Sequence, residues 1–385
     1  MTELPRKVLV LGLARSGKAA AAALERRGVD VVRADRELGN DGDLSLLDSV
    51  DVLVKSPGVP REVALVAEAG RGGIPIWSEV ELGYRLLRPR LLGVTGTNGK
   101  TTTCELLGVM LQAPVAGNVG RALTDLDGQV EPGAWVVCEL SSFQLEDVHE
   151  LACEIAVLLN LEPDHLDRHG SFEAYRDAKL RIFERARTRI VPRGFGLDGI
   201  EFAADEPLPA EPLIRGVHNR ENAAAATAAA RAAGIPDPQI AEALRTFPGV
   251  PHRLELVREL NDVRYVNDSK ATNVAAALRA LAAYEDEPVH LILGGSRKGE
   301  DFTPLAQAIG PNVRSIHLIG ETADELAAAI PGAQRDGDLA TALHEIHPEP
   351  GDVVLLSPAC ASYDQFRDFE DRGEEFRRLV QNLSA

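Results

Sequence analysis

Short apolar runs alternate with longer alanine-rich or amphipathic stretches along the whole chain. Near the N-terminus the apolar run at 7–11 precedes a glycine-bearing turn, an alanine-rich stretch that ends near Arg27, and a second apolar run at 29–34. A strand, a helix and a second strand in this order are typical of a Rossmann-like βαβ unit. The pattern therefore predicts an α/β domain at the start of the chain.

The same alternation continues in two further segments, which proline-marked stretches separate near residues 88–90 and 247–251. In the second segment we expect strands at 90–94, 134–139 and 155–159 and helices from Lys100, at 171–186 and at 219–233. In the third we expect strands at 264–267, 289–293, 315–319 and 352–356, with helices between them. Such alternation predicts mostly parallel sheets covered by helices.

We therefore expect an α/β protein of three domains. They are an N-terminal Rossmann-like domain (1–88), a central P-loop-type ATPase domain with a mostly parallel sheet (89–248), and a C-terminal Rossmann-like domain (249–385). A chain of 385 residues with 45% hydrophobic and 26% charged residues suits two or three such cores.

Composition excludes several classes of protein. A net charge of −18 argues against broad nucleic-acid binding, which needs a basic face. No apolar run reaches the length of a membrane span, and no signal-peptide pattern opens the chain. The four cysteines show no CxxC spacing, which favours reduced thiols over disulfides or a zinc site. We expect a cytoplasmic protein that inserts into no membrane.

Arginine supplies most of the positive charge. Of the 41 basic residues, the lysines are Lys7, Lys18, Lys55, Lys100, Lys179, Lys270 and Lys298. Where arginine serves as the routine cation, a remaining lysine marks a place where a compact ammonium or a free amine is useful. The alternative is that codon usage alone leaves these few lysines.

Residues 93–103, GVTGTNGKTTT, follow an expected strand and open an expected helix. In a P-loop the backbone N–H groups cradle phosphates, Lys100 would reach the terminal phosphates, and the Thr101 hydroxyl can ligate Mg²⁺. The strict GxxxxGK[ST] spacing is not met, because Val94 stands where the first glycine belongs. The strand–loop–helix context still predicts a nucleotide site, since a purely structural turn does not require a Lys–Thr pair at the helix start.

This loop is similar to that of the Mur ligase and folylpolyglutamate synthase superfamily. Two later features extend the resemblance. Glu139 follows a strand, as a Mg²⁺-binding acid should, and residues 160–168 end another strand with a cluster of carboxylates around His165. Within such a cluster His165 looks like a metal ligand or a neighbour of one.

Lys179 lies seven residues after Phe172 and four after Tyr175, near the inward face of its helix. A buried ammonium beside Mg²⁺ would have a lowered pKa, through desolvation and charge repulsion, and a neutral amine can capture CO₂ as a carbamate. Alternatively, the side chain could reach solvent and pair with Glu173 or Asp177. The residues alone leave both options open. The resemblance favours the carbamate, because Mur ligases place a carbamylated lysine in this AKxRIF context.

The third segment carries four motifs, and the last three of them follow expected strands: residues 250–255, 267–273, 294–302 and 357–373. They should gather at the carboxyl edge of a sheet, where open α/β sheets bind ligands. The order of these motifs and their residues resemble those of the Mur ligases that add D-glutamate to UDP-N-acetylmuramoyl-L-alanine. The resemblance covers essentially the whole chain. It implies an ATP-dependent amide ligase of peptidoglycan precursor biosynthesis, which works through an acyl phosphate. The residues themselves do not distinguish D- from L-glutamate.

The resemblance also implies roles for individual residues. Those expected to bind ATP are Thr97, Asn98, Gly99, Lys100, Thr101, Thr102, Thr103, Asn219, Asn222, Arg253, Asp268 and Lys270. Two Mg²⁺ ions would be held by Thr101, Glu139, His165 and carbamylated Lys179, and the catalytic residues would be Lys100, Glu139, His165 and Lys179. Glutamate would contact Thr272, Lys298, Ser362 and Phe369. The UDP-linked precursor would contact Ser16, Asp35, Arg36, Asn118 and Ser141. We expect a monomer whose domains close before chemistry.

The N-terminal turn leaves a competing class open. Residues 12–17, GLARSG, form a GxAxxG variant of the dinucleotide fingerprint, and Asp35 lies 18 positions beyond Gly17. This pattern would also suit a nicotinamide dehydrogenase, although Ala14 crowds the approach of a pyrophosphate. We favour a Rossmann-like fold used for a different nucleotide, in which Ser16 and the helix N-terminus hold the UDP diphosphate and Asp35 and Arg36 face the uracil. A non-catalytic nucleotide sensor would not need the later motifs.

One spacing departs from the family. Only 40 positions separate Lys179 from Asn219, so part of the outer sheet of the central domain is expected to be trimmed. The loops near Asp41 also look short.

Overall fold

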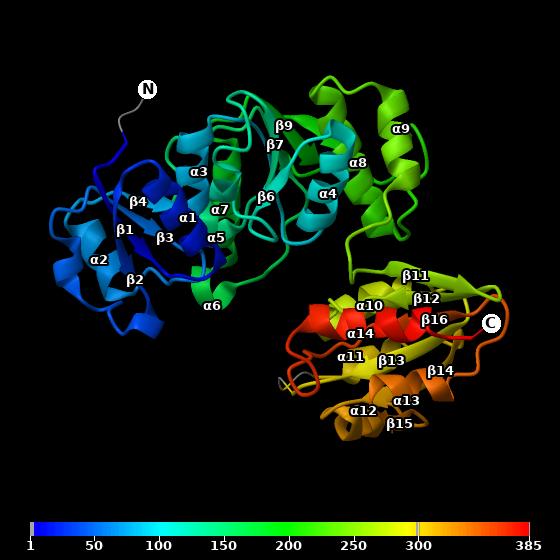
Figure 1. Ribbon diagram of the computed structural model, residues 1–385. Helices are drawn as coiled ribbons and strands as arrows, with labels where there is room; N and C mark the ends of the chain where they lie inside the picture. The colour runs from blue at the N-terminus through cyan, green and yellow to red at the C-terminus, as the bar shows by residue number, and fades with distance from the viewer. Residues whose placement is uncertain (1–3, 298, 300, 385) are drawn as a thin grey trace. The chain divides into compact units, whose positions relative to one another are not determined.

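The computed structural model describes residues 4–297, 299 and 301–384, and within them the strands form three mostly parallel sheets flanked by helices (Figure 1). The α/β fold expected from the sequence is confirmed. The described chain divides into two compact units, one of residues up to 211 with 218–245 and one of 212–217 with the residues from 246 onward. No described helix is both long and apolar enough to cross a membrane.

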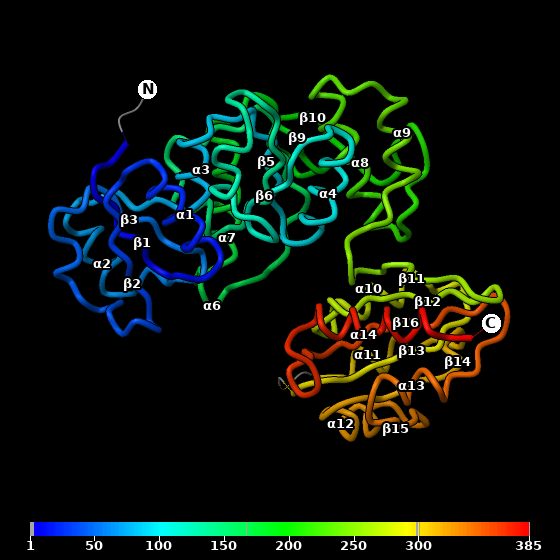
Figure 2. Tube along the Cα trace, in the orientation of Figure 1, coloured from blue at the N-terminus to red at the C-terminus, as the bar shows by residue number. Residues whose placement is uncertain are grey.

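The N-terminal sheet is parallel and has the order β2-β1-β3-β4. Its strands are β1 (Lys7–Leu11), β2 (Asp30–Ala34), β3 (Val52–Lys55) and β4 (Ile76–Ser78). Helices α1 (Arg15–Arg26) and α3 (Glu79–Leu87) pack on one face, and α2 (Ala64–Arg71) packs on the other (Figures 1 and 2). Because both faces are covered, the two central strands β1 and β3 are buried without alternation.

The central sheet has the order β10-β9-β8-β5-β7-β6, and its strands are parallel. They are β5 (Arg90–Thr95), β6 (Val115–Gly117), β7 (Trp135–Glu139), β8 (Ile155–Leu158), β9 (Thr188–Pro192) and β10 (Ile200–Phe202). The helices are α4 (Lys100–Leu111), α5 (Ser142–Leu145), α6 (Leu166–His169), α7 (Phe172–Leu180), α8 (Val217–Ala232) and α9 (Asp237–Thr246). The helix expected at 171–186 is shorter, because α7 gives way to the 3₁₀ helix η4 (Arg181–Phe183).

One hydrophobic core runs from the α1 and α3 face of the N-terminal sheet into the central domain. It joins Val10 and Leu24 of the first to Leu123 and Val136 of the second. This shared core explains why the first two sheets belong to one compact unit.

The C-terminal sheet has the order β11-β12-β16-β13-β14-β15, with β11 antiparallel to β12 and the other pairs parallel. Its strands are β11 (Glu255–Leu260), β12 (Val263–Asn267), β13 (Val289–Gly294), β14 (Val313–Ile319), β15 (Gln334–Gly337) and β16 (Val353–Leu356). Helices α10 (Val274–Ala282), α11 (Thr303–Ala308) and α12 (Ala323–Ala329) cover one face. Helices α13 (Leu339–Glu345) and α14 (Phe369–Gln381) cover the other.

A row of hydrogen-bonded polar side chains crosses the strands of this sheet and is mostly buried. The Asp352 carboxylate lies 3.0 Å from Nε2 of His290, and Nδ1 of the same ring lies 2.7 Å from the Ser315 hydroxyl. That hydroxyl is 2.8 Å from Nε2 of His317, whose Nδ1 is 2.7 Å from Asp336. Both histidines are buried, so the row satisfies polar groups that water does not reach.

Candidate active site

The phosphate loop connects β5 to α4 and lies against α8. Gly99 has a left-handed backbone (φ +82°), and a Cβ at this position would lie 2.1 Å from Oδ1 of Asn222. Glycine is therefore required by the backbone and by the neighbour. The Asn222 amide donates to Oδ1 of Asn219 at 3.5 Å, so both expected adenine ligands lie together, with Asn222 beside the phosphate loop.

The cluster at 160–168 holds the loop in place through Asn160 and Glu162, to which no role was assigned from the sequence. The Asn98 N–H donates to Oδ1 of Asn160 at 2.8 Å, and the Asn98 amide donates to the Glu162 carboxylate at 2.9 Å. The Glu162 N–H donates to the Thr97 hydroxyl at 3.0 Å. Asn160 and Glu162 both lie in the 160–168 cluster, so the position of this cluster after a strand was the feature of the sequence that could have identified them.

Three residues with different predicted roles are in contact around Glu139, which is buried at the end of β7. The Thr101 hydroxyl donates to Oε2 of Glu139 at 2.8 Å, and the Asn118 amide donates to Oε1 at 3.1 Å. The hydroxyls of Thr102 and Thr103 are buried beneath them. The Thr101 and Glu139 oxygens suit Mg²⁺, which keeps several waters and shares phosphates with few protein ligands. Within the described part of the chain, no three or more His, Cys, Asp and Glu side chains group as a metal cage.

Two lysines donate to one backbone carbonyl. Nζ of Lys100 lies 2.9 Å from the carbonyl oxygen of Gly96, and Nζ of Lys179 lies 2.8 Å from the same oxygen. Lys179 is only 2% exposed and lies over the ring of Tyr175, 4.7 Å from its centroid. Burial, reinforced by the charge of Lys100, lowers the pKa of Lys179 to about 7.

The solvent-exposed alternative for Lys179 is therefore wrong. Its ammonium points inward to Gly96, and the carboxylate of Asp177 pairs instead with Arg176 at 2.9 Å. The lowered pKa that the helical spacing predicted is present, with desolvation as its largest cause.

His165 lies at the start of α6 with its side chain half exposed. Its backbone is left-handed (φ 52°), its ring lies 3.6 Å from the Asp164 carboxylate, and the ring of Phe143 is 5.0 Å away between centroids. It is thus held next to a carboxylate and an aromatic ring.

The expected precursor residues of the N-terminal domain lie around the turn after β1. Asp35 accepts hydrogen bonds from the N–H groups of Leu13 and Glu37, and these bonds lower the pKa of its carboxyl group. The Ser16 hydroxyl at the start of α1 lies 3.3 Å from the Ser56 hydroxyl. Arg36 is exposed.

Ser141, the other expected precursor residue of the central domain, caps α5. Its hydroxyl accepts from the N–H of Gln144 at 3.3 Å, and the Gln144 side chain returns a bond to the Ser141 N–H at 3.0 Å. The capping box fixes the start of a short helix directly after the strand that carries Glu139.

In the second unit, Asp268 is buried at the end of β12. Its carboxylate accepts from the Ser357 hydroxyl at 2.8 Å and from the Leu254 N–H at 3.2 Å. Burial raises the pKa of Asp268 to about 7, against the opposing effects of the Ser357 hydrogen bond and of the Arg253 charge. The Lys270 ammonium lies 5.4 Å from the centroid of the Phe369 ring.

Arg372 is a residue to which the sequence assigned no role. It is fully buried in α14, and burial lowers the pKa of its guanidinium to about 10. It donates to the hydroxyl and carbonyl of Ser269, and to the carbonyls of Gly294, Cys360 and Ala361, at 2.9–3.3 Å. Arg372 therefore contacts all three motifs that follow β12, β13 and β16. Their positions after strands predicted that these motifs lie close together.

The expected glutamate ligands follow the same loops. Ser362 is buried directly after Ala361, Thr272 is half buried, and Phe369 is the first residue of α14. Lys298 lies outside the described residues.

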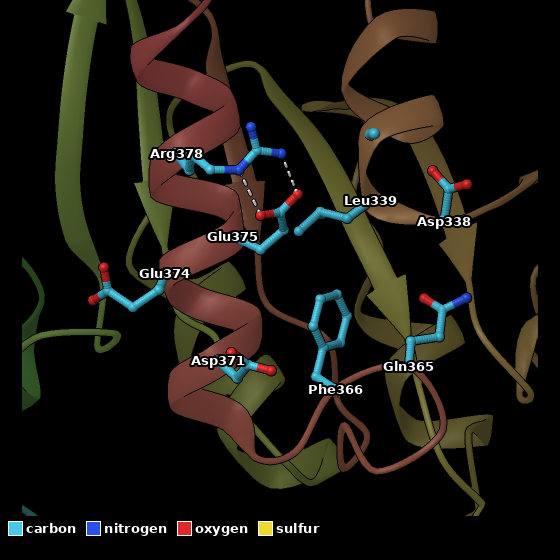
Figure 3. A pocket seen from close by; sticks show the side chains of 9 residues that line it. Asp338, Leu339, Gln365, Phe366, Asp371, Glu374, Glu375 and Arg378 are labelled. Carbon is cyan, nitrogen blue, oxygen red and sulfur yellow. Dashed lines mark hydrogen bonds and ion pairs between the residues drawn. The ribbon is translucent and has the colours of Figure 1, made fainter.

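A separate hollow of about 770 Å³ lies between α13 and α14 (Figure 3). The described ATP and glutamate residues predicted from the sequence do not line it. Its carboxylates have local partners, since Asp338 caps α13 and Glu375 pairs with Arg378 at 2.6 Å. None of the loop residues that Arg372 contacts lines this hollow.

Comparison with known proteins agrees with this geometry. The Mur ligase middle domain matches residues 94–193, and the Mur ligase glutamate ligase domain matches residues 252–360. The UDP-N-acetylmuramoylalanine–D-glutamate ligase of Acidobacterium capsulatum is 38% identical, with 97% of this chain and 96% of that protein covered. That of Myxococcus xanthus is 39% identical, with 98% of each covered. The first alignment spans 444 positions, more than the 385 residues of this chain, so the relative contains segments that are missing here.

Solved structures share the fold at lower identity. The UDP-N-acetylmuramate–alanine ligase of Thermotoga maritima superposes with a TM-score of 0.62 at 19% identity and covers 97% of this chain and 99% of its own. The MurF ligase of the same organism, in complex with ADP, gives 0.61 at 16% identity, with 88% and 92% covered. Together with the relatives that match nearly end to end, these comparisons show that the chain belongs to the Mur ligase family, in the branch of the UDP-N-acetylmuramoylalanine–D-glutamate ligases.

Proposed function

We propose that this enzyme joins D-glutamate to UDP-N-acetylmuramoyl-L-alanine with cleavage of ATP to ADP and phosphate, in peptidoglycan precursor synthesis. The observation that carries the proposal is the group of Lys100 and Lys179 on the Gly96 carbonyl, next to the Thr101–Glu139 contact. Such a group provides positive charge and metal-binding oxygens at a phosphate loop. The names of the similar proteins support this pair of substrates.

The proposed chemistry has two steps. An oxygen of the alanyl carboxylate attacks the γ-phosphorus of ATP, and the bond to the bridging oxygen of ADP breaks, which gives an acyl phosphate. The amine of glutamate then attacks the acyl carbon, loses a proton, and the carbon–oxygen bond to phosphate breaks. Lys100 and the loop N–H groups would neutralise the phosphate charge, and catalysis would come mainly from positioning. Mg²⁺ bound by Thr101 and Glu139 would supply further charge neutralisation.

Lys179 would act as a carbamate. Two ammonium groups that share one carbonyl repel each other, and Lys100 is one cause of the lowered pKa of Lys179. The ammonium first loses a proton, and addition of CO₂ to the resulting neutral amine forms an N–C bond and releases a second proton, so that an anion replaces the cation. With His165, this anion would serve a second Mg²⁺.

The remaining assignments are part of the same proposal. The adenine would lie against Asn219 and Asn222, the C-terminal ATP ligands would be Arg253, Asp268 and Lys270, and glutamate would contact Thr272, Lys298, Ser362 and Phe369. The precursor would contact Ser16, Asp35, Arg36, Asn118 and Ser141. We propose a cytoplasmic monomer with domains at 1–88, 89–248 and 249–385.

The direct test is phosphate release from ATP in the presence of Mg²⁺ and UDP-N-acetylmuramoyl-L-alanine, with a panel of D- and L-amino acids. We expect release that needs both the precursor and D-glutamate. Preference for diaminopimelate or L-lysine would contradict the glutamate assignment, and activity with L-glutamate alone would reverse the stereochemistry. Precursor labelled with ¹⁸O in its alanyl carboxylate should transfer one labelled oxygen to phosphate, and unlabelled phosphate would rule out the acyl phosphate.

A further inference from the structure

Residues 56–59 form a turn after β3 that lies directly against the proposed diphosphate site. The Ser56 hydroxyl donates to the Gly12 carbonyl at 2.7 Å and lies 3.3 Å from the Ser16 hydroxyl. A Cβ on Gly12 would lie only 2.7 Å from Cγ2 of Val59. The turn is therefore a second wall beside the glycine turn after β1, and its position affects any phosphate bound there.

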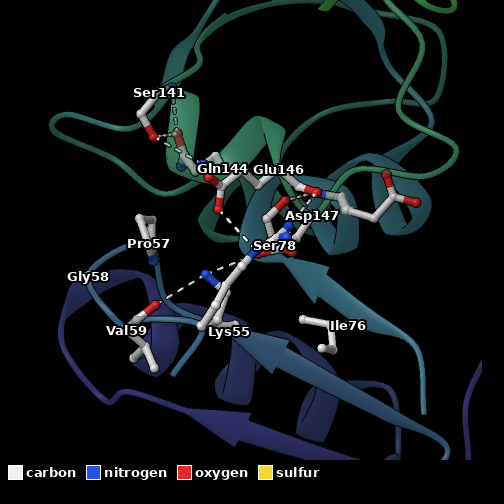
Figure 4. A network of polar contacts seen from close by, with 12 residues as sticks. Lys55, Pro57, Gly58, Val59, Ile76, Ser78, Ser141, Gln144, Glu146 and Asp147 are labelled. Carbon is white, nitrogen blue, oxygen red and sulfur yellow. Dashed lines mark hydrogen bonds and ion pairs between the residues drawn. The ribbon is translucent and has the colours of Figure 1, made fainter. Parts of the chain in front are cut away.

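A buried ion pair links this turn to the central domain. Lys55, the last residue of β3, is 1% exposed, and its ammonium lies 3.0 Å from Oδ2 of Asp147. The same ammonium donates to the Val59 carbonyl at 3.2 Å, and Figure 4 shows both contacts. Asp147 is also buried and lies just after α5, the helix that Ser141 caps. A buried charge is costly without its partner, so the pair restricts how the two elements can separate.

A second cation reaches the turn from the central domain. Arg168, in α6, donates to the Val59 carbonyl at 2.7 Å, to the Pro57 carbonyl at 3.3 Å and to the Gly58 carbonyl at 3.5 Å. Arg168 thus spans three consecutive carbonyl groups, and it shares the third with Lys55. The planar fork of arginine suits such multiple contacts, which the point charge of lysine does not reproduce.

The proposed precursor ligands lie on both sides of this link. Ser16 and Asp35 belong to the N-terminal domain, whereas Asn118 and Ser141 belong to the central domain. One molecule can contact both sets only if their separation matches its length, and small misplacements of binding groups are expensive.

We propose that Lys55, Asp147 and Arg168 are positioning residues that fix the 56–59 turn relative to the central domain, so that the UDP-linked precursor is bound by both domains at once. This inference rests on the proposed function. The competing explanation is that the three side chains only stabilise the fold, and it makes different predictions for ligand affinity.

The first test compares ligand affinities in the full-length protein by calorimetry. Lys55→Met keeps the length of the side chain without its charge, and Arg168→Lys keeps the charge without the fork. Both should weaken binding of UDP-N-acetylmuramoyl-L-alanine about tenfold or more and change the Kd of ATP by less than about twofold. The matched control is Lys7→Met, on the same sheet, whose exposed ammonium bonds the Asp48 carbonyl. It should change neither Kd.

The second test separates positioning from stability. Asp147 also pairs with the exposed Arg61 at 3.2 Å, so Lys55→Met leaves this buried carboxylate without its buried partner but with one exposed cation. In the double variant Lys55→Met/Asp147→Asn no buried carboxylate remains, so the melting temperature should recover from that of Lys55→Met. If the pair positions the turn, precursor affinity should stay weak in the double variant. Recovery of affinity together with the melting temperature would overturn the inference in favour of a structural role.

Ligand binding by the wild-type protein distinguishes failure of the proposed function from failure of the positioning role. If it binds no UDP-N-acetylmuramoyl-L-alanine, the proposed function fails and the inference fails with it. If it binds the precursor and both single variants bind equally well, only the inference is overturned.

Discussion

The carbonyl oxygen of Gly96 accepts from two ammonium groups, and one of them belongs to a side chain that is almost fully buried. For Lys179 the pKa of about 7 means that the neutral amine gains population as the pH rises through 7. Capture of CO₂ should therefore improve above pH 7 and be lost below it. A plain cation would behave in the opposite way, because its charge persists at low pH.

Substitution of Lys179 tests the carbamate. If the functional group is an anion, Lys179→Arg should fail as completely as Lys179→Ala, although arginine preserves the charge of an ammonium. In Lys179→Ala, acetate or formate could enter the vacated space and supply the missing oxygen ligand. Phosphate release should then rise with carboxylate concentration and saturate, while chloride at equal ionic strength has no effect. A near-wild-type Lys179→Arg, or a folded alanine variant that no carboxylate rescues, would exclude the carbamate.

For individual residues, the sequence predicted burial correctly where helical periodicity determines the direction of a side chain. The helical spacing from Phe172 and Tyr175 predicted that Lys179 faces inward, because side-chain direction in a helix follows from position. The same reasoning could not find Lys55 as a buried ion-pair partner. Its neighbour Asp147 is 92 positions away in the sequence, and only the packing of two domains brings them together.

At the scale of elements, Arg372 is the common contact of the loops after β12, β13 and β16. Arg372→Lys should lower the free energy of unfolding by about 2–4 kcal/mol, because lysine cannot satisfy all five contacts and leaves buried carbonyls unpaired. Arg378→Lys in the same helix is a matched control, since Arg378 forms an exposed pair with Glu375 and should change stability by less than about 0.5 kcal/mol. Chemical denaturation measures both, and equal effects would contradict the role of Arg372.

The elements that the sequence predicted well are those with a continuous apolar signal, such as β5, β13 and β16. The edge strands β11 and β15 were not predicted. In β11 every residue is exposed or half buried and none is fully buried, and β15 is mostly exposed. An edge strand covered on one side has too few buried positions for a hydrophobic pattern, and its pairing is decided by the neighbouring strand.

At the scale of the molecule, the first two sheets share a core while each carries its own proposed nucleotide site. Sequence composition marked a linker near residue 88, but it did not show that apolar residues on both sides pack together. Contacts between segments far apart in the sequence create this core, and no local pattern records them.

Asp35→Ala in the full-length protein tests whether the two sites are distinct. Loss of the carboxylate removes the acceptor for the Leu13 and Glu37 N–H groups, so precursor binding should weaken about tenfold. ATP binding should be unchanged, because the phosphate loop lies in another domain. Calorimetry with each ligand measures the difference. Tight binding of NADH to the wild-type protein would revive the dehydrogenase alternative.

In the network of side chains that runs from Asp352 through His290, Ser315 and His317 to Asp336, the number of hydrogen atoms limits which contacts can form together. A neutral imidazole has one N–H, and with both carboxylates ionised His290 and His317 each direct theirs to an aspartate. The Ser315 hydroxyl has a single hydrogen but faces a ring nitrogen on either side. It can donate to only one of them, and the other contact then requires a hydrogen that a neutral ring does not have.

Both contacts to Ser315 can be hydrogen bonds at the same time only if the network contains one hydrogen more than two neutral rings and the hydroxyl supply. The ¹⁵N spectra of the two imidazole rings test this directly, because they distinguish ring nitrogens that carry a hydrogen from those that do not. Ser315→Ala removes the central hydroxyl and with it the need for the additional hydrogen, so the variant is the matched comparison for these spectra. Two neutral rings in the folded wild-type protein would mean that one of the two contacts to Ser315 is broken in solution.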